Sequence, residues 1–241
     1  MATFVLVHGA FHAAWSWCKV KPLLEEAGHA VIAPDLPGHG TRYNPAAREF
    51  SIESYAEDVC TVLDVVGGPV VLVGHSLGGA VVSRAAEKKP EKVRRLVFVA
   101  AFMLQGGQCI RDYSSPAADS PLYSNLIWTE DRRFATLPGD KFGDAFCHDA
   151  APKDAALGGL LSLPEPMQPP LERLVLTDEN YGAIPKSYVE CNNDRALKPE
   201  LQQKMIEATT CEAVHELETA HDPMLSRPEE LAVILLDAAR R

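Results

Sequence analysis

The stretch Val70-Val-Leu-Val-Gly-His-Ser-Leu-Gly-Gly79 decides the fold. Its first four residues are apolar and mostly β-branched, which is typical of a buried strand, and residues 80–89 have the pattern of a helix. Between them, Gly74, Ser76 and Gly78 fit the motif G-x-S-x-G. The glycines let the two backbones approach closely and leave room for a strained conformation at the serine. The stretch predicts a sharp turn that presents the Ser76 hydroxyl as a nucleophile. A glycine-rich turn without chemistry is the alternative.

Outward from this turn, strand and helix patterns alternate along the chain. Apolar runs at 3–7, 29–33 and 95–100 predict further strands, and periodic apolar residues at 13–27 and 51–66 predict helices. Strands are also expected within 185–191 and at 213–217, each followed by a helical pattern. The alternation predicts an α/β fold whose mostly parallel central sheet is flanked by helices.

The alternation disappears between Phe102 and about Pro185, where Pro, Gly and Ser are frequent. A loop of this length is unusual inside a compact domain, so we expect an inserted, largely helical cap at 103–185. Residues 1–102 and 186–241 would then form the core. Several apolar cap residues could line a pocket, although cap core is the simpler interpretation of each: Met103, Leu126, Ile127, Trp128, Phe134, Phe142, Phe146, Leu160, Leu161 and Met167.

Composition excludes several classes of protein. The formal net charge is -10, which argues against a nucleic-acid partner, and no apolar run approaches the ~20 residues of a membrane span. The six cysteines are scattered, and no His or Cys pair has the spacing of metal ligands. The start of the chain lacks the pattern of a signal peptide. We therefore expect reduced thiols, no metal, no membrane partner and a cytoplasmic location.

Three residues in different predicted loops can form a nucleophilic constellation. A serine hydroxyl is a weak nucleophile that needs an adjacent base, and His221 follows the last predicted strand. Asp194 follows the strand within 185–191 and can orient the imidazole of His221. The chain order Ser76, Asp194, His221 is the order Ser, Asp, His that accompanies this kind of turn.

Three other carboxylates are alternatives for the acid. Asp35 precedes the serine in the chain, and we interpret it as structural. Asp178 falls in the predicted cap. Asp222 is adjacent to His221, which makes the required hydrogen bond awkward.

Two backbone N–H groups are candidates for binding the negative charge that develops on a substrate oxygen. One is that of Ala10, in the turn His8-Gly-Ala10 after the first strand, where a plain turn is the alternative. The other is that of Leu77, because it directly follows the nucleophile. These two groups would form an oxyanion hole.

Longer segments resemble a known group of proteins. Val5-Leu-Val-His-Gly-Ala-Phe-His-Ala-Ala-Trp-Ser-Trp17, Val73-Gly-His-Ser-Leu-Gly-Gly79 and Ala220-His-Asp-Pro-Met-Leu-Ser-Arg-Pro228 are similar to segments of the plant methyl esterases and hydroxynitrile lyases of the α/β-hydrolase superfamily, and of related bacterial esterases that include pyrethroid hydrolases. The resemblance implies the α/β-hydrolase fold, the triad Ser76, Asp194 and His221, the oxyanion hole at Ala10 and Leu77, and no cofactor. Because many members are dimers, a homodimer is possible. We expect the substrate pocket to include Gly9, Phe11, His75, Phe102, Trp128 and Met224.

This chain differs from the hydroxynitrile lyases at two positions, and both differences favour hydrolysis over lyase chemistry. The lyases that this sequence resembles carry Thr or Asn where this chain has Gly9, and the Thr type has Lys where this chain has Asp222. Gly9 offers no side chain to hold a cyanohydrin hydroxyl, and an acid beside His221 would not hold cyanide. The sequence therefore predicts a serine carboxylesterase for small to medium apolar esters. A cofactor-free C–C lyase and a ligand receptor of the same fold are the alternatives.

Overall fold

The computed structural model of the protein describes residues 1–44, 46–47, 49–113 and 120–241. Its central sheet has the strand order β2-β1-β3-β4-β8-β9, and every neighbouring pair is parallel. The strands are β1 (Thr3–Val7), β2 (Ala30–Ile32), β3 (Val70–His75), β4 (Val93–Val99), β8 (Lys186–Cys191) and β9 (Ala213–Leu217). The predicted parallel sheet is confirmed, and its carboxyl-terminal edge is where the candidate residues meet.

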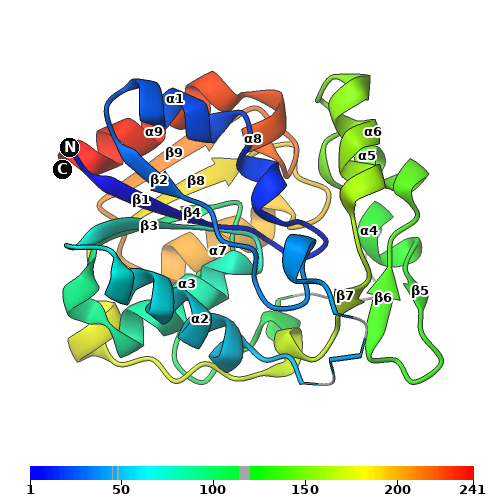
Figure 1. Ribbon diagram of the computed structural model, residues 1–241, viewed down its shortest axis with the longest axis horizontal. Coiled ribbons are helices and arrows are strands. Elements are labelled where there is room, and N and C mark those ends of the chain that lie inside the picture. The colour runs from blue at the N-terminus through cyan, green and yellow to red at the C-terminus, as the bar shows by residue number, and fades with distance from the viewer. Residues whose placement is uncertain (45, 48, 114–119) are drawn as a thin grey trace.

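Helices cover both faces of this sheet (Figure 1). They are α1 (Val20–Glu26), α8 (Pro223–Ser226) and α9 (Pro228–Arg240) on one side, and α2 (Ile52–Val65), α3 (Gly78–Lys88) and α7 (Pro199–Ala208) on the other. The helix expected at 13–27 is in two pieces, a short 3-10 helix at Ala14–Trp17 and then α1. Pro22 lies in the first turn of α1, where its missing N–H costs no hydrogen bond.

Alternation along β1 explains how one strand serves two cores. Phe4 and Leu6 pack on the side of α1 and α9, whereas Val5 and Val7 pack on the side of α2 and α3. All four side chains are fully buried. A strand of a parallel sheet that is covered on both faces is apolar throughout for this reason.

The segment between β4 and β8 contains a second, smaller sheet. Its order is β5-β6-β7, formed antiparallel by Ile127–Trp128, Phe134–Thr136 and Glu165–Pro166. The helices α4 (Pro121–Ser124), α5 (Gly139–Phe146) and α6 (Pro152–Leu161) accompany it at one end of the molecule (Figure 1). Strands of two or three residues leave no readable alternation, so the sequence indicated only helices here. The boundaries of the cap at 103–185 stay a prediction.

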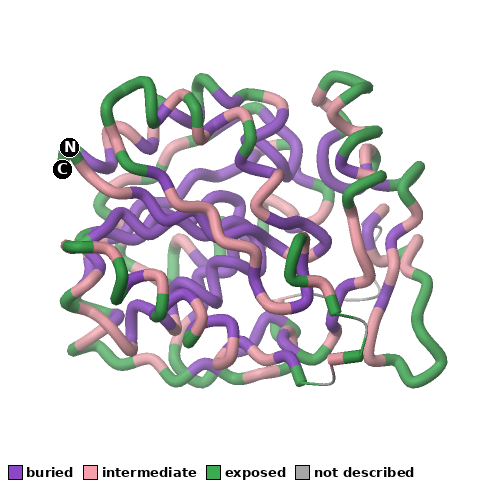
Figure 2. Tube along the Cα trace, in the orientation of Figure 1, coloured by how far each residue is buried: buried purple, intermediate pink, exposed green. Residues whose placement is uncertain are grey.

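Buried residues concentrate in the central strands, and exposed residues lie on the outer loops and on the far side of the small sheet (Figure 2). Beyond β7 the chain is joined to the core at α2, because Glu172 accepts hydrogen bonds from Ile52 N (2.6 Å) and Glu53 N (3.2 Å). All six cysteines are free thiols in the structure. Within the described residues, no helix has the length and apolar character that crossing a membrane requires.

Candidate active site

The turn after β3 holds Ser76 in a strained backbone conformation. Its φ is 52°, in the left-handed region that non-glycine residues rarely adopt. A Cβ at Gly74 would lie 2.6 Å from the Gly78 carbonyl oxygen, and one at Gly78 would lie 2.6 Å from the His8 carbonyl oxygen. The Ser76 carbonyl accepts hydrogen bonds from Gly79 N (3.0 Å) and Phe102 N (3.1 Å). The close approach and the strain expected at this turn are both present.

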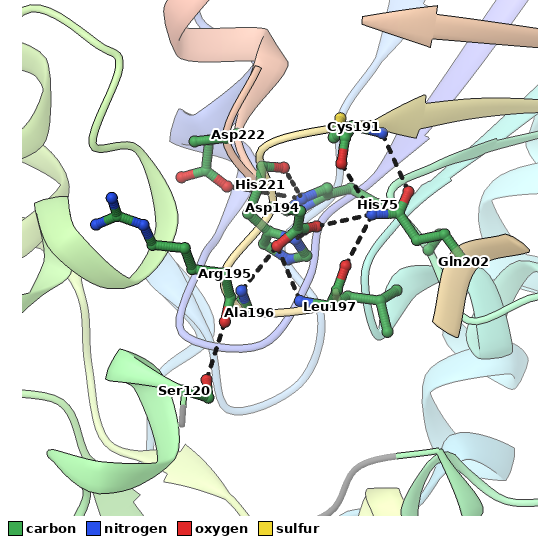
Figure 3. A network of polar contacts seen from close by, with 12 residues as sticks. His75, Ser120, Cys191, Asp194, Arg195, Ala196, Leu197, Gln202, His221 and Asp222 are labelled. Atoms are coloured by element: carbon green, nitrogen blue, oxygen red, sulfur yellow. Dashed lines mark hydrogen bonds and ion pairs between the residues drawn. The ribbon is translucent and has the colours of Figure 1, made fainter. Parts of the chain in front are cut away.

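His221 and Asp194 form a direct hydrogen bond, with 2.6 Å between Nδ1 and Oδ2 (Figure 3). Asp194 also accepts hydrogen bonds from Ala196 N (2.7 Å) and Leu197 N (2.8 Å) at Oδ1, and from Gln202 Nε2 (3.2 Å) at Oδ2. These four donors hold the carboxylate in one orientation. Since a carboxylate only accepts hydrogen bonds, the Nδ1 atom of His221 carries a proton, and Nε2 keeps its lone pair in the neutral ring.

The electrostatic surroundings of His221 favour its protonated form. Burial alone would lower its pKa, but the Asp194 carboxylate, its hydrogen bond and the charge of Asp222 together raise the pKa above the ordinary value of 6.5. The His75 ring lies 4.6 Å from the His221 ring between centroids. Burial, followed by the charges of His221 and His12, holds the pKa of His75 well below the ordinary value, so His75 stays neutral.

A cavity of about 330 Å³ opens onto Ser76. Of the residues predicted for the site, those that line this cavity are Ala10, Phe11, Ser76, Leu77, Phe102 and Trp128. This volume is typical of a small-molecule site. The structure thus brings the nucleophile candidate, both residues of the predicted oxyanion hole and three pocket candidates together.

Hydrogen bonds fix the loop that contains Ala10. The Gly9 carbonyl accepts from His8 Nδ1 (2.9 Å), and the Ala10 carbonyl accepts from His12 Nδ1 (2.7 Å). Leu36 N donates to His8 Nε2 (3.0 Å), so the His8 proton resides on Nδ1. Because each carbonyl is held, the peptide planes and the direction of the Ala10 N–H are fixed as well. A preorganised N–H donor of this kind is what an oxyanion hole requires.

Three other pocket candidates do not line the cavity. His75 is fully buried behind the turn, with Nε2 3.0 Å from the His221 carbonyl oxygen. Met224 belongs to α8 and is fully buried in the core. Gly9 has no side chain, and a Cβ there would lie 2.7 Å from the Ser76 Cβ. Gly9 and His75 contact residues of the site from behind its surface.

Four of the ten apolar cap residues that could line a pocket do line the cavity: Leu126, Trp128, Phe146 and Met167. The six others do not: Phe142 and Met103 are buried in the core, Phe134 packs against Phe50, and Ile127, Leu160 and Leu161 are exposed. Apolar character alone could not separate these two groups.

The alternative carboxylates have other partners. Asp35 accepts hydrogen bonds from Ala14 N (2.8 Å), Thr41 N (2.8 Å) and Thr41 Oγ1 (2.7 Å), so it organises its own turn. Asp178 is exposed. Asp222 pairs with His12, with 3.0 Å between Asp222 Oδ2 and His12 Nε2.

Sequence reasoning missed the buried group formed by His12, His75 and Asp222. Their ligand-type atoms lie within 4.8 Å of one another, and among the described residues this is the group that could hold a metal ion. The three residues lie far apart in the chain, so no ligand spacing was visible. Asp222 Oδ1 is 3.6 Å from His75 Nε2, which already donates to the His221 carbonyl. The ring nitrogens of His12 and His75 that face Asp222 therefore already have protein partners.

The sequence also gave no reason to select Gln202, Glu165 or His39. Gln202 is fully buried on α7 and ties Asp194 to the Leu197 carbonyl oxygen (2.7 Å from Nε2). Glu165 lines the cavity and pairs with His39. Only the fold brings these side chains to the site, because each lies in a stretch without a motif.

A parallel sheet with a serine at such a turn, and a His–Asp pair on later loops of the same edge, defines the nucleophile-elbow class of α/β proteins. The chain belongs to the alpha/beta hydrolase family, whose model matches residues 4–234. The resemblance noted in the sequence is confirmed, and so is the fold.

Individual relatives point the same way. The chain is 36% identical over 248 residues to a putative methylesterase 11, chloroplastic, of Arabidopsis thaliana, covering 98% of this chain and 64% of that protein's length. It is 32% identical to salicylic acid-binding protein 2 of Nicotiana tabacum, covering 99% and 97%. The crystal structure of polyneuridine aldehyde esterase superposes with a TM-score of 0.88 at 28% identity and covers 99% of both chains.

Proposed function

We propose that this protein is a serine carboxylesterase that hydrolyses small to medium apolar carboxylic esters through an acyl-enzyme intermediate. The observation that carries the proposal is the 2.6 Å contact between His221 Nδ1 and Asp194 Oδ2, beside a cavity onto which Ser76 opens. The names of the relatives, two of them esterases, support ester hydrolysis.

In the acylation step, Ser76 Oγ attacks the ester carbonyl carbon while His221 Nε2 takes the hydroxyl proton. The carbonyl oxygen becomes an oxyanion, and the N–H groups of Ala10 and Leu77 stabilise it. His221 then gives its proton to the alkoxide of the leaving alcohol as the C–O bond breaks. Asp194 stabilises the transient imidazolium and holds the ring in the required tautomer.

In the deacylation step, a water molecule attacks the acyl carbon and passes a proton to His221 Nε2. The bond to Ser76 Oγ breaks, the serine takes the proton back, and the carboxylic acid leaves. The raised pKa of His221 suits both roles, because a base with a pKa near the working pH accepts and returns a proton readily.

The lyase alternative has less support from the residues of this chain. A Cβ at position 9 would lie 2.7 Å from the Ser76 Cβ and 3.0 Å from His75 Nδ1, so the Gly9 loop has no room for a side chain that grips a cyanohydrin. Asp222 is buried and paired, and it offers no cation for cyanide. The receptor alternative, the cytoplasmic location and the homodimer stay predictions.

The test is turnover of p-nitrophenyl acetate and butyrate by the wild type and Ser76→Ala. Ser83→Ala is the matched control, because this hydroxyl lies on the following helix and donates to the Gly79 carbonyl oxygen (2.8 Å) without lining the cavity. We expect turnover to disappear in Ser76→Ala alone. A fluorophosphonate probe should label the wild type once, at Ser76.

Each other outcome points to a different function. Equal turnover by wild type and Ser76→Ala would overturn the esterase proposal. A burst of one equivalent of p-nitrophenol without turnover would favour the receptor. Mandelonitrile cleavage without ester hydrolysis would favour the lyase.

A further inference from the structure

Glu165 is a buried carboxylate in the wall of an otherwise largely apolar cavity. It belongs to β7, its exposed fraction is 1%, and it lines the same cavity as Ser76. Its Oε2 atom accepts hydrogen bonds from Phe11 N (2.6 Å) and from His39 Nε2 (2.9 Å). Phe11, which donates one of these bonds, has a strained backbone with a φ of 62°. The carboxylate is thus fixed beside the oxyanion loop.

The hydrogen bonds of His39 show that the other carboxylate oxygen of Glu165, Oε1, is an acceptor. The Nδ1 atom of His39 faces the Pro37 carbonyl oxygen at 3.1 Å, and therefore carries a proton. One further proton lies between His39 Nε2 and Glu165 Oε2, whichever atom it is bonded to. In both cases Oε1 carries no proton and is a hydrogen-bond acceptor.

Oε1 has no hydrogen-bond partner among the described residues, although it is buried. A buried acceptor without a donor costs free energy, and a ligand that supplies the donor recovers it. We propose that Glu165 Oε1 accepts a hydrogen bond from the substrate, so that this pocket selects esters that carry a hydroxyl or N–H group on an otherwise apolar portion. The identity of the esters rests on the proposed esterase function, whereas the selection of a donor group does not.

Geometry limits where this donor group sits in the substrate. Phe11 N, which binds Glu165 Oε2, belongs to the residue next to Ala10, the proposed oxyanion donor. Backbone dimensions then place the carboxylate within about 10 Å of the substrate carbonyl oxygen. A hydroxyl on a phenyl ring attached near the ester satisfies this limit. The shared proton leaves the His39–Glu165 pair without net charge, which favours a neutral donor over a cation.

Tyr55 is the alternative donor for Oε1. Burial and then the Glu165 charge raise its pKa, so the two groups are near one another, and the Tyr55 hydroxyl also has no hydrogen-bond partner among the described residues. No hydrogen bond joins them in the structure. Because Glu165 lines the cavity and Tyr55 does not, a substrate can reach the carboxylate.

The experiment compares methyl esters of phenylacetic acid that carry a hydroxyl or a methoxy group at the meta or para position. The methoxy group keeps the oxygen and removes the donor. The Kd of each ester is measured on Ser76→Ala, and kcat/KM on the enzyme with Ser76 intact. We expect at least one hydroxyl isomer to be preferred over its methoxy partner by roughly ten-fold or more in both measurements.

Glu165→Gln should abolish this preference. The amide oxygen must stay where Phe11 N and His39 need an acceptor, so its NH₂ group replaces Oε1 and presents a donor. Using the ratio of two esters on the same variant cancels any effect on the oxyanion loop. Glu172→Gln is the matched control, because Glu172 also accepts two backbone N–H groups but does not line the cavity. Its ratio should equal that of the wild type.

Two results would overturn the inference. One is a ratio near one for both isomers in the wild type, including the case in which the ratio rises only in Tyr55→Phe because Tyr55 occupies Oε1. The other is the same ratio in Glu165→Gln as in wild type. If the binding preference holds but no ester is turned over, the esterase proposal fails and the inference stands. If turnover depends on Ser76 but no hydroxyl ester is preferred, the esterase proposal stands and this inference fails.

Discussion

His12 and Asp222 lie 210 positions apart in the chain, and His12 Nε2 contacts Asp222 Oδ2 at 3.0 Å. The other ring nitrogen of His12 binds the Ala10 carbonyl oxygen at 2.7 Å. One imidazole therefore joins the loop of the proposed oxyanion donor to the loop of the proposed base, His221. The distance between these two groups is set through His12 and Asp222, neither of which lines the cavity.

We predict that Asp222→Asn weakens catalysis through position. It leaves the His12 contact without its carboxylate, so kcat/KM should fall about ten- to a hundred-fold and the free energy of unfolding by about 1–3 kcal/mol. Asp222 also raises the pKa of His221, and His221 must be unprotonated to act as a base. The acid limb of the kcat/KM profile should therefore move to lower pH.

The measurements for Asp222 are a pH–rate profile and urea unfolding. Asp149→Asn is the control. Asp149 accepts a hydrogen bond from Ala220 N (3.1 Å), and Ala220 lies on the same loop as Asp222. Its acid limb should stay in place. An acid limb that moves to higher pH in Asp222→Asn would contradict the assigned electrostatic role.

Asp194→Asn should lower kcat by a factor of about 10³–10⁴ while the protein stays folded. The amide can donate to His221 Nδ1 and so favour the tautomer whose proton lies on Nε2, where it blocks proton transfer from the serine. Single-turnover acylation with p-nitrophenyl butyrate measures this directly. The exposed Asp178, changed to Asn, is the control. Similar rates in both variants would show that another acid serves His221.

Gly9→Ala should lower kcat about a hundred-fold, because the new Cβ would lie 2.7 Å from the Ser76 Cβ and displace the Ala10 N–H. Gly67→Ala is the matched control, since a Cβ there has no neighbouring atom within 4 Å. The readout is kcat on p-nitrophenyl butyrate, with circular dichroism to monitor the fold. Full activity of Gly9→Ala would mean that this loop does not contribute an oxyanion donor.

The His39–Glu165 pair should make part of the stability depend on pH. Burial lowers the pKa of His39, but the charge and hydrogen bond of Glu165 raise it above 6.5 overall. A raised pKa in the folded state gives stability that is fully present below about pH 6.5 and is lost as the pH rises through the folded pKa.

Urea unfolding of wild type and His39→Gln from about pH 6 to about pH 9 tests this contribution. The difference in free energy of unfolding should shrink as the pH rises. His148→Gln removes an exposed histidine and controls for the loss of any imidazole. A difference that grows with pH would mean that His39 is neutral in the folded state.

Local patterns were enough to predict the sheet and the turn at Ser76. The apolar, mostly β-branched run 70–73 is typical of a buried strand, and Gly74 and Gly78 are required by backbone contacts of 2.6 Å. Asp194 and His221 were selected because each follows a strand, and strands of one parallel sheet end at one edge. For these residues, position in the chain implied position in space.

The rest of the site depends on contacts that no local pattern encodes. Glu165 lies on a strand of two residues and reaches Phe11 across 154 positions. His39 lies in a turn, and its partner Glu165 comes from a distant strand. The sequence places Asp222 next to His221, but its pairing with His12 depends on the fold. Such pairings are set by tertiary packing of the cap and the loops, so the sequence left them open.

The strand order has a consequence for how the protein is made. Ala10 follows β1 near the start of the chain, whereas β9, which precedes the loop of His221, is the last strand in the chain and lies at the edge of the sheet. A nascent chain held on the ribosome before residue 221 has emerged would lack the proposed base for Ser76. Reactivity of Ser76 with a fluorophosphonate would then appear abruptly during synthesis, and its onset would report when the sheet is complete.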